Sequence, residues 1–196
     1  TPYVTEFIDQ VSKLSNGSLA VEPAWNPTSG PTYEKDLVQR VLDGDYDLAV
    51  AASRAWDDQN AASLHVLQAP FLITDDALAE AVAASDVAAR LLDSLSAAGA
   101  VGLTMWPEDL RHPFSVMPDE PLLTPQDFAG KVMRGGPANI TIEMLKTLGA
   151  SDVMLEDSGY QGAESGFLNG YTLMGKPTAT GNVTFFAKFQ SLFAND

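Results

Sequence analysis

The chain has 196 residues, of which 45% are hydrophobic and 19% charged, an ordinary balance for a globular protein. Eleven Lys and Arg stand against twenty-six Asp and Glu, and the formal net charge of −15 excludes nucleic-acid binding, which needs clustered basic side chains. The lack of cysteine excludes a disulfide scaffold, Cys-ligated zinc and iron–sulfur clusters. No apolar run is long enough to cross a bilayer.

The first hundred residues predict helices and strands in alternation. Apolar residues at helical spacing predict helices over residues 4–14 and 77–98. A further helix between these two is expected to end at Asp43-Gly44. Alternating or continuous apolar runs predict strands or extended segments over 18–25, 46–52, 67–73 and 101–106. This order is typical of an α/β fold with a mostly parallel sheet that is covered on both faces.

The pattern breaks at residues 107–130, which contain five prolines, and this stretch is the expected crossing between two domains. Beyond it we expect strands at 131–134, 152–155 and 171–174, helices at 138–148 and 159–168, and extended segments at 183–186 and 192–194. We therefore predict a first lobe of residues 1–124 with a return segment 183–196, and a second lobe of 125–182. Because the chain starts on a helix and stops as a strand ends, we expect both ends to be truncated.

The strongest local feature is Arg134, which ends a predicted strand and is followed by Gly135-Gly136 and a helix. In open α/β sheets ligands lie beyond the carboxyl ends of strands, beside helix N-termini. A guanidinium next to the positive end of a helix dipole can grip both oxygens of a carboxylate. The same spacing also fits a surface arginine in an ordinary loop, so the pattern alone leaves both interpretations open.

Motifs for catalysis are weak. The two histidines, His65 and His112, are too far apart for a short metal motif, and the sequence has no nucleophile elbow, phosphate loop or dinucleotide-binding glycine motif. Adjacent carboxylates such as Asp57-Asp58 do not converge on one substrate, and we interpret them as caps and solvated turns. We expect no enzyme, no cofactor and no metal site.

Six segments together resemble a known family. They are NGSLAV at 16–21, LDGDYDLA at 42–49, APFLI at 69–73, LTPQDFAGKVMR at 123–134, LGA at 148–150 and YQGAESGFLNG at 160–170. Their order and spacing resemble the DctP-type substrate-binding proteins of TRAP transporters (tripartite ATP-independent periplasmic transporters). The resemblance implies two α/β lobes of the periplasmic-binding-protein type that close over a ligand. It also implies a periplasmic or extracellular protein, secreted or lipid-anchored, whose partners are a small organic anion and a membrane permease.

The resemblance implies that Arg134 pairs with the carboxylate of an organic acid and that Arg111 supports it. The residues predicted to line the ligand site are Arg134, Arg111, Asn139, Tyr33, Ser53, Phe71, Trp106, Tyr160 and Thr172. Two positions depart from the family pattern: residues 171–174 lack a ligand-binding asparagine, and Tyr33, next to Glu34, stands where an acidic residue is common. These departures predict a ligand that is less hydroxylated, or more apolar, than sugar acids.

Two other functions compete with this interpretation. The same two-lobed fold serves as the ligand-binding domain of signalling receptors, which a neighbouring receptor gene would reveal. A small hydrolase or isomerase that uses carboxylates needs a converging acidic pair, and the sequence offers no convincing candidate.

Overall fold

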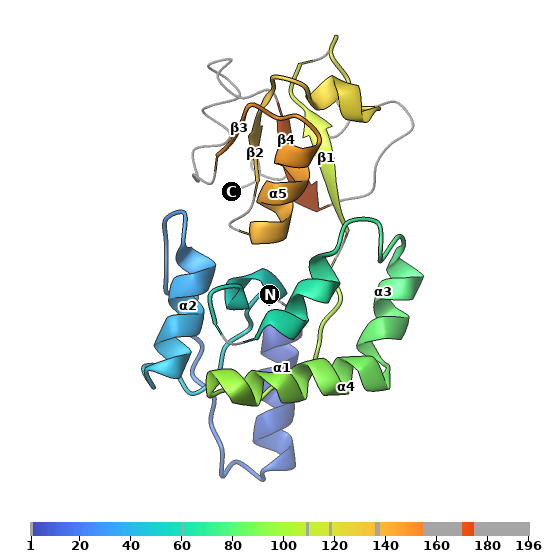
Figure 1. Cartoon of the computed structure of the whole chain (residues 1–196). Coiled ribbons are helices and arrows are strands. Elements are labelled where there is room, and N and C mark those ends of the chain that lie inside the picture. The colour runs from blue at the N-terminus through green and yellow to red at the C-terminus, as the bar shows by residue number, and fades with distance from the viewer. Residues whose placement is uncertain are drawn as a thin grey trace.

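Helices come first along the chain, and the sheet follows after residue 110. The computed structural model describes residues 2–59, 61–108, 110–117, 119–135, 138–154 and 170–174. We call the described residues up to 108 the helical part and those from 110 onward the sheet part. Figure 1 shows the sheet part above the helical part, with α5 in front of the strands.

The helical part contains both α-helices and short 3-10 helices (η). Their bounds are α1 Pro2–Leu14, α2 Tyr33–Leu42, η1 Ser53–Trp56, η2 Ala62–Gln68, α3 Asp76–Ala83, α4 Asp86–Asp93 and η3 Ser94–Ala98. The predicted single helix over 77–98 is wrong, because Ser85 interrupts it. The hydroxyl of Ser85 accepts the N–H of Val87 and so starts α4 as a new helix.

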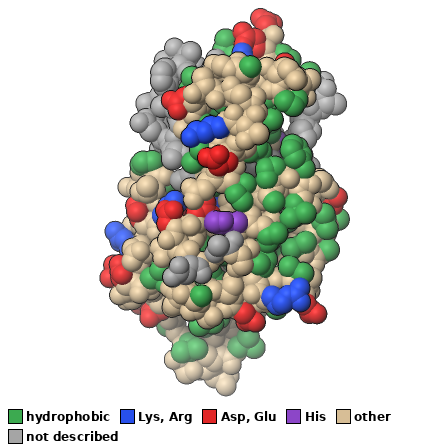
Figure 2. Space-filling model, viewed as in Figure 1, with side chains coloured by type: hydrophobic (Ala, Val, Ile, Leu, Met, Phe, Trp, Pro, Cys, Tyr) green, Lys and Arg blue, Asp and Glu red, His purple; other side chains and the backbone are tan. Residues whose placement is uncertain are grey.

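The predicted strands at 18–25, 46–52 and 101–106 are absent from the described helical part, where these segments form neither helix nor ladder. The segment 67–73 instead contains the end of η2 and a turn. Val101 is 82% exposed and Val50 is 63% exposed, so the apolar positions of two of these segments are not buried. Alternating hydrophobicity predicts extended backbone but does not supply a hydrogen-bonded neighbour. Figure 2 shows hydrophobic side chains gathered on one side of this part.

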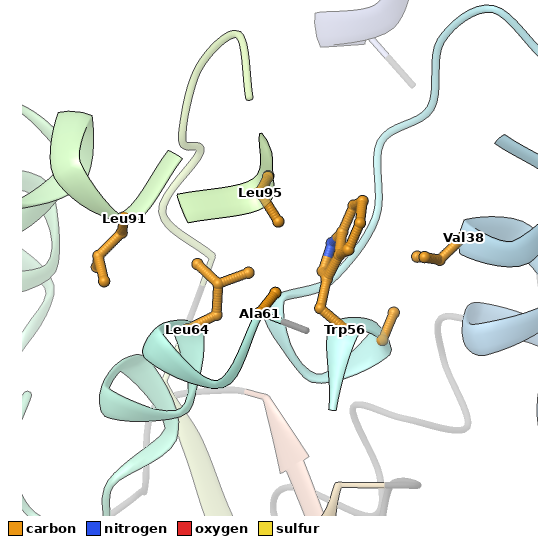
Figure 3. Packing of buried hydrophobic residues seen from close by; sticks show 7 residues of the cluster. Val38, Trp56, Ala61, Leu64, Leu91 and Leu95 are labelled. Atoms are coloured by element: carbon orange, nitrogen blue, oxygen red, sulfur yellow. The ribbon is translucent and has the colours of Figure 1, made fainter. Parts of the chain in front are cut away.

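The core of the helical part joins α2, η1, η2, α4 and η3. Its buried members are Val38, Ala55, Trp56, Ala61, Leu64, Leu91 and Leu95, and Figure 3 shows Leu64 and Leu95 turned toward the space beside the Trp56 ring. Burying a side chain of this size stabilises the fold by about 1.5–3 kcal/mol. This core therefore fixes η1 and η2 against α2, the arrangement on which the site depends.

The sheet part has four described strands in the order β1-β4-β2-β3. Their bounds are β1 Arg111–Ser115, β2 Val132–Arg134, β3 Asp152–Met154 and β4 Gly170–Met174. β2 is parallel to both β3 and β4, whereas β1 is antiparallel to β4. The described structure is therefore a mixed α/β fold with a small sheet. The expectation of mostly parallel sheets holds only for strands β3, β2 and β4.

The prediction of strands near 131–134, 152–155 and 171–174, and of a helix near 138–148, is confirmed by β2, β3, β4 and α5 (Asn139–Thr147). β1 lies in the stretch that its prolines marked as irregular, together with the short η4 (Pro125–Phe128). As an edge strand, β1 tolerates Pro113, because one row of its backbone groups needs no ladder partner. The helix expected at 159–168 and the segments at 183–186 and 192–194 lie outside the described residues.

A second core holds α5 to the sheet. Phe128, Met133 and Leu145 are its buried members, with Val153 among the side chains packed against them. The sheet part thus has its own hydrophobic core, separate from that of the helical part. The predicted lobe boundaries at 124, 125 and 182 stay a prediction, and β1 pairs with β4 although it precedes residue 125.

Candidate functional site

Arg134 is the last residue of β2, an interior strand of the sheet. Its backbone pairs with Met154 of β3 on one side and with Tyr171 of β4 on the other. The side chain is partly buried. A guanidinium at the carboxyl end of an interior strand stands where ligands bind in open α/β sheets.

Two other predicted site residues lie on the same sheet. Thr172 of β4 directly follows the residue that pairs with Arg134, and Arg111 begins β1 opposite Met174. The sheet therefore brings Thr172 close to Arg134 along the backbone, whereas Arg111 lies two strands away, at the edge. Tyr160 lies outside the described residues.

Gly135 follows Arg134 and is buried. A Cβ atom built there would lie 3.3 Å from Val153 Cγ1 and 3.4 Å from Thr141 Cγ2. The backbone at Gly135 therefore packs closely between β3 and α5, which sets the short path from Arg134 to the helix.

The N-terminus of α5 is occupied by another part of the chain. The backbone N–H of Asn139, the first helical residue, donates to Oδ2 of Asp57 at 2.8 Å. The positive end of this helix was expected beside the ligand carboxylate, and at the N–H of Asn139 a carboxylate of the helical part takes that place. The side chain of Asn139 is exposed, and its role in ligand binding stays a prediction.

Three polar residues at the junction of α2 and η1 form a network that the sequence argument missed. Oε1 of Glu34 accepts a hydrogen bond from the hydroxyl of Tyr33 at 3.0 Å and another from Nη2 of Arg54. Glu34 is 8% exposed, and its Oε2, like Nε of Arg54, is buried without a hydrogen-bond partner. Buried polar atoms are normally paired, so one free acceptor and one free donor suit a polar ligand group.

Only the pairing of Tyr33 with an acidic neighbour was visible in the sequence. Arg54 lies twenty residues beyond Glu34 and reaches it because α2 packs against η1. Ser53, predicted as a site residue, begins η1 directly before Arg54 and is partly buried. Figure 2 shows acidic and basic side chains side by side on the face of the helical part, near the sheet part.

The two remaining predicted residues are exposed. Phe71 is 85% exposed and has a φ of +63°, which is rare for a residue with a large side chain. Trp106 is 45% exposed and lies in the extended segment that leads toward β1.

The described residues contain no group of three or more His, Asp or Glu side chains that could hold a metal ion. Of the helices described, none is long and apolar enough to cross a membrane.

Comparison with known proteins adds a family and a fold. Residues 2–155 match the family model of bacterial extracellular solute-binding protein, family 7 (DctP). A TRAP periplasmic solute-binding protein from Xanthobacter autotrophicus, solved with bound β-D-galacturonate, is 25% identical with a TM-score of 0.72, and the match covers 84% of this chain and 54% of that one.

Two further solved TRAP periplasmic solute-binding proteins share the fold. The protein from Pseudomonas aeruginosa, with bound L-malate, is 20% identical with a TM-score of 0.71, over 85% of this chain and 56% of that one. The protein from Marinobacter aquaeolei, an apo open structure, is 21% identical with a TM-score of 0.72, over 87% and 55%.

The chain spans about half the length of the solved chains that it matches. The family model, in contrast, matches well over half of this chain. The chain therefore belongs to family 7 (DctP) of the bacterial extracellular solute-binding proteins, a family of binding proteins and not of enzymes.

Proposed function

We propose that this chain captures a small organic acid outside the cytoplasm, fixes its carboxylate with Arg134, and presents it to a TRAP-type membrane permease. Family membership supports the capture of a solute, and the galacturonate and L-malate bound by two matched structures support a carboxylate. A periplasmic location follows from the same family, whereas the permease partner is an expectation from the TRAP relatives alone.

The observation that carries the proposal is the place of Arg134. It ends an interior strand, its neighbouring strands β3 and β4 run parallel to it, and α5 follows within five residues. Arginine is suited to this place because its planar guanidinium donates two parallel hydrogen bonds to one carboxylate. On a chain of net charge −15, a cation at a strand end also stands out as a place for an anion.

The helical part supplies the second surface of the proposed site. There the Tyr33–Glu34–Arg54 network leaves one buried acceptor and one buried donor unused. A hydroxyl group of the ligand would satisfy both, because it can donate to Oε2 of Glu34 and accept from Nε of Arg54. In this proposal the two parts close over the ligand by hinge bending, and closure excludes water and strengthens the ion pair with Arg134.

Isothermal titration calorimetry with D-galacturonate, L-malate and succinate tests the function. We expect wild type to bind at least one of these acids. Removing one partner of a buried, hydrogen-bonded charge pair costs about 2–5 kcal/mol, so Arg134→Ala should lose about thirtyfold or more in affinity. Arg134→Lys should lose less, because it keeps the charge without the bidentate geometry.

A matched control is Arg90→Ala, which removes the same charge from an exposed position on α4. It should leave the affinity unchanged. If Arg134→Ala binds every acid as tightly as wild type does, Arg134 is not the anion anchor. If wild type binds no organic acid at all, the proposed function itself is wrong.

A further inference from the structure

Asp57 directly follows η1, and its side chain has no exposed surface. Its Oδ1 atom accepts a hydrogen bond from Nε2 of Gln68 at 3.1 Å. Nε2 of His65 lies 3.2 Å from the same oxygen without forming a hydrogen bond. Gln68 and His65 both belong to η2, so one oxygen of this carboxylate is held entirely within the helical part.

The other oxygen faces the sheet part. Oδ2 of Asp57 accepts the N–H of Asn139, eighty-two residues further along the chain. Figure 1 shows α5 with its N-terminal end directed toward the helical part, and α5 contacts η2. The two oxygens of a single buried carboxylate thus connect two separately packed cores.

The N-terminus of α5 requires such a partner. Its N-cap residue is Ala138, which has no side-chain acceptor for the first N–H groups of the helix. An aspartate at this place satisfies one of these donors and puts a negative charge at the positive end of the helix dipole. Asp57 therefore supplies from the helical part the cap that α5 lacks in its own sequence.

We propose that Asp57 is a latch that holds the helical and sheet parts in the closed arrangement. The inference rests on the proposed hinge closure over an organic acid. When the parts separate, the carboxylate loses its hydrogen bond from Asn139 but keeps the one from Gln68, which holds it in place. Because the carboxylate is already oriented, the contact re-forms with little loss of side-chain entropy.

The latch also links closure to ligand binding. Asn139 lies five residues after Arg134, so the cap and the proposed anion anchor flank one short connection. Fixing the start of α5 fixes the path of that connection. Weakening the latch should lower the closed population and, with it, the apparent affinity for the acid.

Pulsed electron–electron spin resonance on ligand-free protein measures the arrangement directly. The chain has no cysteine, so Ala89→Cys and Lys146→Cys, both at exposed helix positions on opposite sides of the contact, take spin labels uniquely. We expect the labelled wild type to show a population at the distance of this structure. In Asp57→Ala, the ratio of the population at this distance to the population at longer distances should fall about tenfold. This is the factor expected for the loss of one charged helix cap.

Two further variants sharpen the test. Asp57→Asn keeps an oxygen acceptor and the side-chain volume but removes the charge, so its shift should be smaller than that of Asp57→Ala; it also replaces Asp57→Ala if that variant fails to fold. The matched control is Asp58→Ala, which removes the adjacent, exposed carboxylate that pairs with Lys35. It should leave the distances unchanged.

The outcomes separate the latch from the function. Distance distributions that are the same in wild type and both Asp57 variants would overturn the latch, even if organic acids still bind. A shift in the Asp57 variants together with no acid binding by wild type would support the latch and overturn the proposed function. If both hold, Asp57→Ala should bind D-galacturonate or L-malate up to tenfold more weakly, with Arg134 intact.

Discussion

Arg54 donates to Glu34 inside the helical part, and the charged pair is almost fully removed from water. The side chains of Arg54 and Glu34 are 15% and 10% exposed. Desolvation of two charges is costly and can exceed their mutual attraction, so such a pair is weak evidence for stability. The pair lies next to Tyr33 and leaves one donor and one acceptor unused. This arrangement favours a role in ligand binding over a role in stabilising the fold.

Removing one member of this pair should destabilise the fold strongly. Glu34→Ala leaves the Arg54 charge buried and alone, and we expect the free energy of unfolding in urea to fall by about 3 kcal/mol. The double variant Glu34→Leu with Arg54→Leu should lose less than the sum of the single losses, because no charge is left unpaired.

The Lys35–Asp58 ion pair provides the control for the buried pair. Asp58 is exposed, and exposed pairs contribute about 0–1 kcal/mol. Asp58→Ala should therefore cost far less than Glu34→Ala. Equal losses in the two variants would contradict the view that Glu34 is buried as a charged group.

A second prediction concerns Gly102, where the chain passes close to α4. A Cβ at this position would lie 2.7 Å from both Cβ and Cδ2 of Leu92 and 2.9 Å from its Cα. A backbone atom cannot move aside like the end of a side chain, so Gly102→Ala should cost about 1–3 kcal/mol of unfolding free energy.

Gly135→Ala is the matched comparison for Gly102→Ala. Its Cβ would approach the nearest atom, Val153 Cγ1, only to 3.3 Å. Alanine also reduces the entropy of the unfolded chain, a gain of about 0.4–1 kcal/mol that should offset most of this tighter contact. Chemical denaturation of both variants checks the ranking, and a larger loss at Gly135 would show that the packing of α4 differs from the structure.

A third prediction follows from the backbone of Phe71. A residue with a Cβ in the left-handed region costs about 1–2 kcal/mol relative to glycine, and Phe71 loses little packing because it is exposed. Glycine also raises the entropy of the unfolded chain by about 0.5–1 kcal/mol. Phe71→Gly should therefore raise the midpoint of thermal unfolding slightly, whereas Leu72→Gly, without a positive φ, should lower it.

The same variants report on function. Strained residues persist where the side chain is needed for binding, and Phe71 is a predicted ligand-site residue. A more stable Phe71→Gly variant with weaker binding of the organic acid would explain the strain. A less stable variant would show that the Phe71 side chain packs in a way that outweighs its backbone conformation.

The sequence predicted the sheet part far better than the helical part, for a physical reason. β2 and α5 follow from local signals: a short apolar run, then Gly135, then helical spacing that ends before Gly149. For residues 101–106 the same kind of signal predicted extended backbone, but a strand also needs a partner, which only the fold supplies.

The candidate site shows the same limit. The place of Arg134 could be predicted because it depends on adjacent residues, the strand before it and the helix after it. The bonds from Arg54 to Glu34 and from Asn139 to Asp57 span twenty and eighty-two residues, and no local pattern encodes them. The interpretation of Asp57-Asp58 as caps and solvated turns holds for Asp57 only in part: it caps α5, which no local pattern foresaw, but its side chain is buried and not solvated.

The last prediction concerns pH and Asp127, in the turn before β2. Its Oδ2 accepts the backbone N–H groups of Thr124 at 2.6 Å and of Leu123 at 2.9 Å, and also the hydroxyl of Thr124. These hydrogen bonds to the charged form lower the pKa of Asp127 below its ordinary value of 3.8, with the Thr124 N–H as the largest cause. A lowered pKa in the folded state means that the stabilisation is fully present above the unfolded pKa and is lost as the pH falls through the folded pKa.

Asp127→Asn should therefore lower the midpoint of thermal unfolding at pH 7, and its difference from wild type should shrink as the pH falls from about 5 to about 3. The control Asp45→Asn removes an exposed carboxylate and should change the midpoint little at any pH. A difference between Asp127→Asn and wild type that stays constant or grows toward low pH would contradict the assignment, because the charged carboxylate would then not be the group that holds the turn.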